Sequence, residues 1–237
     1  MSFSAYPEYS ESSVPWLGRV PSHWSVHRLK HSVATCKNGI WGDDPQGDDN
    51  DIACVRVADF NREKLVAAPE NPTIRNVDAS DLRFRRLQKG DLLLEKSGGG
   101  EKQPVGCVVL YEGPPGATCA NFIARIALAS EMSPSFWRYV HAAIYSANLN
   151  KRSIKQTSGI QNIDQQAYLD ERVAFPPPDE QKQIADFLDH ETARIDALIE
   201  EQQRLIELLA EKRQSVLSRA VTQGINANPA MTETGLC

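Results

Sequence analysis

The residues best suited to chemistry begin with a glycine-rich stretch near the middle of the chain. It runs through Lys96, Ser97, Gly98, Gly99, Gly100, Glu101, Lys102 and Gln103. Glycine allows close approach to the backbone amides, and two ammonium groups attract phosphates, so the stretch suits contact with phosphates or bases. A flexible hairpin connection is the simpler interpretation of this stretch taken alone.

A second polar stretch covers residues 150–162. Its basic members are Lys151, Arg152 and Lys155, and its amides include Gln156, Gln161 and Asn162. Lysine and arginine supply a salt-dependent attraction to phosphates, whereas Gln and Asn can form paired hydrogen bonds with base edges. The stretch therefore has the composition of a nucleic-acid contact.

A third candidate is the loop at residues 36–42, in which Lys37 and Trp41 stand among small residues. It is followed by five aspartates between residues 43 and 51, which would repel a polyanion and are expected to cap the loop or face solvent. Arg83, Arg85 and Arg86 form a further basic group, for which a solvated surface is an equally good interpretation.

Motifs for catalysis are missing from the sequence. No GxxxxGK[ST] phosphate loop is present, and neither Asn71-Pro72 nor Asn228-Pro229 continues with the proline and aromatic residue of an amino-methyltransferase. Asp91, Glu95 and Lys96 approach a nuclease site, but adjacent strand residues point to opposite faces. We therefore assign no catalytic residue.

Metal ligands do not cluster either. The five cysteines are an odd number without a CxxC pair. His23, His27 and His31 recur every four residues, but no nearby Asp, Glu or Cys completes a site. No metal site is expected in this chain.

The charge is distributed unevenly along the chain. The net charge is -5, and residues 176–237 hold 6 basic against 11 acidic residues, whereas residues 1–175 hold 20 of each. Because five of those acids lie between residues 43 and 51, the rest of the first part is positive. Local charge decides whether phosphates are attracted, so the acidic total does not exclude nucleic acid.

Three prolines at 176–178 separate two kinds of sequence. Residues 1–175 predict an α+β domain with curled sheets and packed helices, including strands at 52–57, 91–95, 105–111 and 122–128 and a helix at 133–149. Residues 176–224 are expected to form a long helix, with its body at 179–221, and residues 225–237 a tail. No stretch of 18 apolar residues and no signal peptide is visible, so a cytoplasmic protein without a membrane partner is expected.

The long helix has an apolar stripe at heptad spacing. Its predicted pairing positions are Ile195, Leu198, Gln202, Leu205, Leu209 and Val216. A rod of about 60 Å with such a stripe needs a covering partner, which favours pairing with a second long helix over folding back on its own domain. One copy alone does not give the partner or its direction.

Several segments together resemble the specificity subunit of type I restriction-modification enzymes. Residues 14–24 (VPWLGRVPSHW) with 26–30 are similar to the opening of a target-recognition domain in that family, and residues 87–94 with Ser97-Gly98 to its central strand and loop. The most specific match is residues 175–188 (FPPPDEQKQIADFL) continuing to Ile199, which resemble the start of the family's spacer helix.

The resemblance implies a non-catalytic DNA-binding subunit that recognises half of a bipartite site in double-stranded DNA. It implies docking to modification subunits, which bind S-adenosylmethionine, and to restriction subunits, with ATP and Mg²⁺ held by those partners and no cofactor on this chain. Backbone contacts are then expected from Lys96, Lys102, Lys151, Arg152 and Lys155, and base contacts from Gln103, Gln156, Gln161 and Asn162. Lys37 and Trp41 would add contacts from the first loop.

The chain departs from the family pattern, because it has one recognition domain and one spacer helix where two of each are usual. Homodimerisation through an antiparallel coiled coil would restore two domains, and the DNA site would then be an interrupted inverted repeat. A non-catalytic adaptor that dimerises through the helix and binds another protein is the alternative. A free-standing methyltransferase or nuclease is opposed by the missing motifs.

Overall fold

The computed structural model describes residues 5–100, 102–157 and 159–225. The chain divides into two compact units, residues 1–185 and 186–237. The strands are β1 (Tyr9–Glu11), β2 (Arg19–Pro21), β3 (Ser25–Arg28), β4 (Val33–Asn38), β5 (Asp51–Val55), β6 (Val66–Ala67), β7 (Thr73–Asn76), β8 (Leu92–Glu95), β9 (Ser97–Gly98), β10 (Val108–Tyr111), β11 (Thr118–Cys119), β12 (Ile123–Leu128), β13 (Ile154–Thr157), β14 (Ile160–Ile163) and β15 (Arg172–Phe175). The α-helices are α1 (Ala79–Leu82), α2 (Pro134–Ser146), α3 (Gln165–Leu169) and α4 (Pro178–Gln223), and the 3-10 helices are η1 (Leu29–Ser32), η2 (Val57–Asp59) and η3 (Leu149–Ser153).

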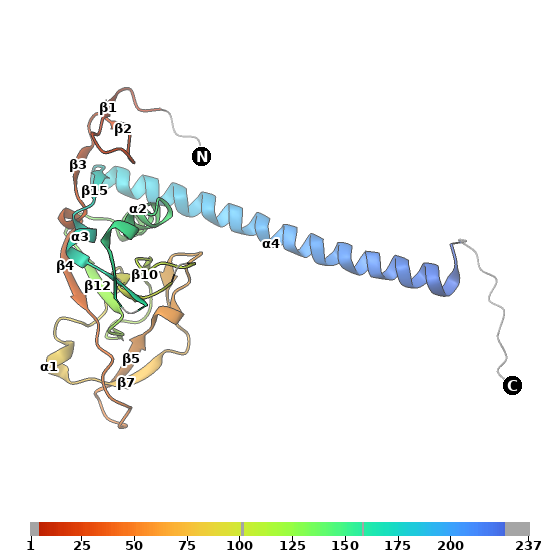
Figure 1. Ribbon diagram of the computed structural model, residues 1–237, viewed down its shortest axis with the longest axis horizontal. Helices are drawn as coiled ribbons and strands as arrows, with labels where there is room; N and C mark the ends of the chain where they lie inside the picture. Colours follow the sequence, from red (N-terminus) through yellow and green to blue (C-terminus); the bar gives the residue numbers. More distant parts are fainter. Residues whose placement is uncertain (1–4, 101, 158, 226–237) are drawn as a thin grey trace. The chain divides into compact units, whose positions relative to one another are not determined.

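A five-stranded sheet in the order β4-β12-β8-β10-β6 forms the centre of the first unit (Figure 1). All its neighbours are antiparallel except the parallel pair β10 and β6. Side chains alternate across a strand, so Leu92 and Leu94 join one apolar cluster and Leu93 the other. Apolar residues on both faces explain why these strands are continuously hydrophobic in sequence. The predicted α+β class is confirmed.

The predicted elements are present with small shifts at their ends. The strand expected at 52–57 ends at Val55, because the chain turns into η2. The strand expected at 105–111 begins only at Val108, after Gly106 adopts a φ of 106° that interrupts the extended backbone. The helix expected at 133–149 ends at Ser146, and Asn148 then takes a left-handed φ of 58°.

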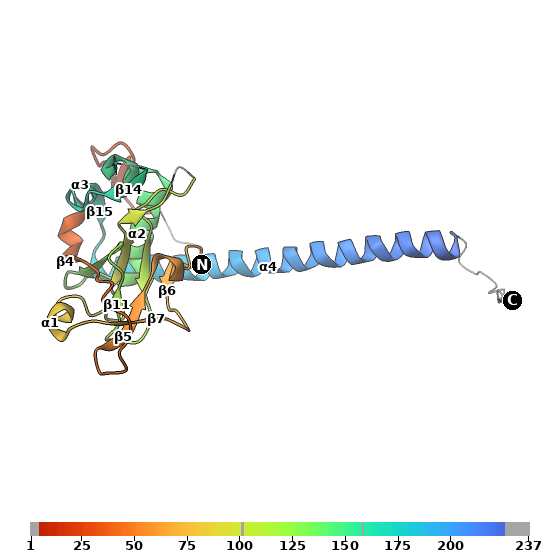
Figure 2. The ribbon, with the colours of Figure 1, turned by 60° about the horizontal axis from the view of Figure 1, so that its bottom comes forward.

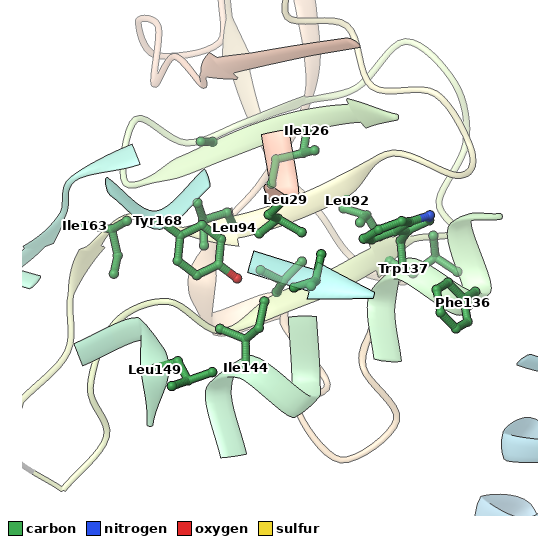
Figure 3. Packing of buried hydrophobic residues seen from close by; sticks show 14 of the residues in the cluster. Leu29, Leu92, Leu94, Ile126, Phe136, Trp137, Ile144, Leu149, Ile163 and Tyr168 are labelled. Carbon is green, nitrogen blue, oxygen red and sulfur yellow. The ribbon is translucent and has the colours of Figure 1, made fainter. Parts of the chain in front are cut away.

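The larger core cluster lies between the central sheet and α2 (Figure 3). Helix α2 begins where Ser133 Oγ accepts a hydrogen bond from Phe136 N, with Pro134 in the first turn. The helix then buries Trp137 and Ile144, which are both 0% exposed. Complete burial of these side chains stabilises the fold by about 1.5–3 kcal/mol each.

The start of α4 is anchored within the first unit by Gln181, which is 1% exposed. Its Oε1 accepts hydrogen bonds from Trp137 Nε1 and Ser133 N (both 3.1 Å), and its Nε2 donates to Pro176 O (2.9 Å). The helix itself runs from Pro178 to Gln223, which lies within the expected 176–224 and extends two residues past the end of the expected body at residue 221.

The second unit contains the rest of α4. Its apolar side chains remain largely exposed within the chain, including Ile195 (52%), Leu205 (47%) and Leu209 (55%). The expected coiled-coil pairing of this stripe stays a prediction.

No helix in the described part of the chain is both long and apolar enough to cross a membrane.

Candidate nucleic-acid interface

The two polar stretches found in the sequence meet in one small sheet, in the order β13-β14-β9 (Figure 2). Gln161 is opposite Gly98, and Asn162 is opposite Ser97. Across the other edge of β14, Lys155 is opposite Asn162 and Gln156 is opposite Gln161. Residues 150–162 thus contain the end of η3 followed by the antiparallel pair β13 and β14.

Polar side chains within this sheet hold the glycine-rich stretch in place. Ser97 Oγ donates a 2.6 Å hydrogen bond to Asn162 Oδ1, and Ser97 is 7% exposed. Gln161 is 8% exposed, and its Oε1 accepts from Val105 N at 3.2 Å. The structure therefore places Ser97, Gln161 and Asn162 as supports of the loop.

The far end of the glycine-rich stretch is fixed by two further contacts. Asn150 Nδ2 donates to Val105 O (2.7 Å), and Tyr145 Oη donates to Pro104 O (2.9 Å). A Cβ on Gly99 would come within 2.9 Å of Gln103 O and of Val105, so only glycine fits the turn without displacement. These contacts hold Gly99 and residues 103–105 in place.

The exposed candidates in and beside this sheet are mostly cations and amides: Lys102, Gln103, Lys151, Arg152, Lys155 and Gln156. Lys155 Nζ lies 2.5 Å from Asp164 Oδ2, and this contact lowers the pKa of the Asp164 carboxyl. Arg152 lies 3.7 Å from Glu171. Both cations stay largely exposed, at 75% and 67% of their side-chain areas.

A polar hollow lies where β4, the residues that follow α1 and the start of α3 meet. It is lined by Cys36, Lys37, Asn38, Phe84, Arg85 and Gln165. Gln165 Nε2 donates to Asn38 Oδ1, and Phe84 is 61% exposed. Burial raises the pKa of the Cys36 thiol to about 11, and the charges of Lys37 and Lys96 oppose that rise. The Lys96 charge therefore acts on Cys36, although 60 residues separate the two in sequence.

Trp41 is fixed by a neighbouring arginine. The Arg75 guanidinium stacks on its ring at 4.7 Å and donates to Trp41 O (3.2 Å) and Gly42 O (3.0 Å). The aspartates after the loop are held by Asn76, whose Nδ2 donates to Asp48 Oδ1 (2.7 Å) and Asp51 Oδ1 (2.8 Å). Asp43, Asp44, Asp48 and Asp49 are exposed, which agrees with the expectation that these acids face solvent.

A groove beside the glycine-rich stretch contains two residues that the sequence did not single out as binding residues. Its lining includes Arg62 and Glu95 together with Gly99, Gly100, Lys102 and Gln103. Arg62 Nη2 lies 2.9 Å from Glu95 Oε2, and Glu95 is 3% exposed. No local motif marks the pair, because 33 residues separate its members.

The N-terminal segment and the first turn of α4 meet at Glu180. Its carboxylate accepts hydrogen bonds from Tyr6 Oη (2.8 Å) and Trp24 Nε1 (2.9 Å), and His23 Nε2 lies 2.6 Å away. Burial alone would raise the pKa of Glu180, but these three partners lower it. Residues 14–24 and 175–188, which resemble the opening segment and the spacer-helix start of the same family, are thus in direct contact.

Among the residues that the structure describes, no group of three or more His, Cys, Asp or Glu side chains could hold a metal ion.

Comparison with protein families identifies the class to which this fold and surface belong. The family model described as type I restriction modification DNA specificity domain matches residues 70–208, which is more than half of the chain. The chain belongs to that family. It is the specificity part of such systems and not their catalytic part.

Individual relatives agree with this assignment. The chain is 23% identical over 211 residues to a protein named as the type I restriction enzyme MjaX specificity subunit of Methanocaldococcus jannaschii, covering 88% of this chain and 48% of that protein. It superimposes on a chain from a structure of the type I R-M system with a TM-score of 0.62 at 17% identity, covering 87% of this chain and 47% of that one. The HsdS subunit of Thermoanaerobacter tengcongensis gives a TM-score of 0.54 at 18% identity, with 87% and 46% covered. The chain therefore spans about half the length of these relatives.

Proposed function

We propose that this chain recognises one half of a bipartite site in double-stranded DNA for a type I restriction-modification system. The observation that carries the proposal is the convergence of the glycine-rich and basic stretches on the β13-β14-β9 sheet, inside a DNA specificity domain. Cations at the edges of such a surface attract phosphates, and amides beside them suit base edges.

The proposed contacts divide by exposure. Phosphate contacts fall to Lys37, Lys96, Lys102, Lys151, Arg152 and Lys155, with Trp41 as an added aromatic contact. Base contacts fall to the exposed amides Gln103 and Gln156. Ser97, Gly98, Gly99, Gln161 and Asn162 belong to the same site, where they shape the surface from which the others reach DNA.

We also propose that two copies pair through α4. The stripe of exposed apolar residues along the second unit supports this, since such a surface is stabilised by a partner. The charge pattern favours an antiparallel arrangement. Residues 186–200 hold five acidic and one basic residue, whereas residues 201–223 hold three acidic and four basic residues. In an antiparallel pair, the acidic half of one helix would face the more basic half of the other, which is favourable. In a parallel pair, the two acidic halves would face each other and repel.

The expected partners follow from the family. Modification subunits would dock on the dimer and supply S-adenosylmethionine and the methyl-transfer chemistry, and restriction subunits would bring ATP and Mg²⁺. No cofactor is proposed for this chain.

Light scattering of the purified chain, alone and with its modification subunit, tests this proposal. We expect twice the 26.3 kDa chain mass alone and a larger complex that contains two modification subunits. Affinity for DNA should fall steeply with salt, with a logarithmic slope of about -0.9 per phosphate contacted. A monomer whose binding is insensitive to salt, with a defined protein partner, would favour an adaptor instead.

A further inference from the structure

The groove beside the glycine-rich stretch contains an arginine held by a buried acid. Glu95 ends β8 in the centre of the five-stranded sheet, and at 3% exposure its carboxylate is almost completely removed from water. Burial raises the pKa of Glu95, and the charge of Arg62 opposes that rise. A buried carboxylate is costly without a cation, so the pair fixes where the guanidinium lies.

A second side chain orients the same guanidinium from the other side. With its amide oxygen turned toward Arg62, Gln103 accepts from Arg62 Nε at 2.6 Å and from Nη1 at 3.3 Å. Arginine has five N–H donors, and contacts to one carboxylate and one amide do not exhaust them. The Arg62 side chain keeps 26% of its area exposed in the groove.

The wall of the groove permits close approach by a ligand. Nothing lies within 4 Å of a Cβ built on Gly100, and Gly98 likewise faces open space. Lys102, which is exposed at the same groove, offers an ammonium group beside it. The combination is a pre-oriented guanidinium, a neighbouring ammonium group and an unobstructed backbone.

We propose that Arg62 is a specificity-determining residue that contacts a guanine edge in the major groove, with Glu95 as its positioning residue and Gln103 orienting the same guanidinium in addition to its own proposed base contact. This proposal rests on the proposed DNA-recognition function. An arginine whose plane is fixed can donate two parallel hydrogen bonds to guanine O6 and N7, a pairing that distinguishes guanine from the other bases. Glu95 acts only through Arg62, since it is buried.

Selection from a library of randomised double-stranded DNA by the full chain with its modification subunit tests the proposal. The variants are Arg62→Gln, the double change Arg62→Gln with Glu95→Gln, and Lys102→Gln. The double variant avoids an unpaired buried carboxylate, and circular dichroism with a thermal melt verifies that each variant folds.

We expect the wild type to require guanine at one position of each half-site. Both Arg62 variants should lose that requirement, with affinity for the selected site about 10- to 100-fold lower and the other positions unchanged. Lys102→Gln should weaken all sequences equally and keep the guanine. An unchanged preference, or an equal loss on every sequence in the folded double variant, would overturn the assignment of Arg62. Absence of DNA binding by the wild type would overturn the DNA-recognition function itself.

Discussion

Ser97 and Asn162 lie 65 residues apart in the chain and share a 2.6 Å hydrogen bond across neighbouring strands. This bond joins the glycine-rich stretch to the basic hairpin, so neither polar stretch is positioned independently. Ser97 is 7% exposed, so little water reaches its hydroxyl to compete for this hydrogen bond.

The change Ser97→Ala should lower the free energy of unfolding by about 1 kcal/mol, since Asn162 loses a donor. Urea denaturation measures this, and Ser146→Ala at an exposed site is the matched control, expected to stay within about 0.5 kcal/mol of wild type. Equal stability of both variants would show that the bond does not stabilise the fold.

Replacing Gln181 should have a larger effect on stability, because its side chain anchors the start of α4 within the first unit. Gln181→Ala would leave Trp137 Nε1, Ser133 N and Pro176 O without their present partner. Each group left unsatisfied costs about 1–3 kcal/mol, so the loss of all three partners should cost at least about 3 kcal/mol in chemical denaturation. Gln183→Ala changes the same residue type on the exposed side of the helix and should cost far less. A small effect at Gln181 would mean that water replaces these bonds.

The sequence predicted the helices and strands that are marked by local patterns, such as apolar runs and capping residues. The run at residues 91–95 indicated a strand, and Ser133-Pro134 indicated the start of α2. The absence of glycine and proline from residue 179 to 221 predicted α4 to within two residues at its C-terminal end. These signals are local, so one chain suffices to detect them.

The site was less predictable, because its contacts are not local. Gln161 was expected to contact a base, yet its side chain accepts a hydrogen bond from Val105 N, which lies 56 residues away in sequence. Arg62 and Glu95 are 33 residues apart, so the sequence does not indicate that they form an ion pair in the folded chain. Composition therefore marked the polar stretches, but pairing between distant strands decided which of their side chains face outward.

Acid should destabilise the first unit through His141. This side chain is 0% exposed, its Nδ1 lies 2.7 Å from Tyr168 Oη, and burial lowers its pKa from 6.5 to about 3. Between those values the unfolded chain binds a proton that the folded chain does not, so stability is lost as pH falls below 6.5. The expected loss is up to about 1.4 kcal/mol per pH unit.

The change His141→Gln should reduce the difference in unfolding free energy between pH 7 and pH 5 and keep a hydrogen-bonding partner for Tyr168. Urea titrations at the two pH values measure it. His190→Gln, at an exposed histidine of α4, should leave the wild-type pH dependence intact. The same pH dependence in all three proteins would assign the acid sensitivity to other groups.

Lys37 should contribute to DNA affinity through charge alone. Lys37→Gln removes one phosphate contact, so the logarithmic salt slope should decrease in magnitude by about 0.9 without a change in sequence preference. Fluorescence anisotropy on one DNA duplex at several salt concentrations measures the slope. Lys182→Gln, an exposed change on α4 outside the proposed contacts, should leave it unchanged, and equal slopes in the two variants would exclude Lys37 from the interface.

The proposed helix pairing makes the sharpest prediction for assembly. Leu205 is 47% exposed within a single chain and sits in the middle of the apolar stripe, so Leu205→Glu would bury a charge in a paired interface. We expect this variant to be a monomer by light scattering at a micromolar concentration where the wild type is a dimer. Gln203→Glu adds the same charge two residues away, outside the stripe, and should remain dimeric. A dimeric Leu205→Glu protein would place the contact elsewhere on the chain, whereas loss of the dimer in both variants would indicate that net charge, not the apolar stripe, controls association.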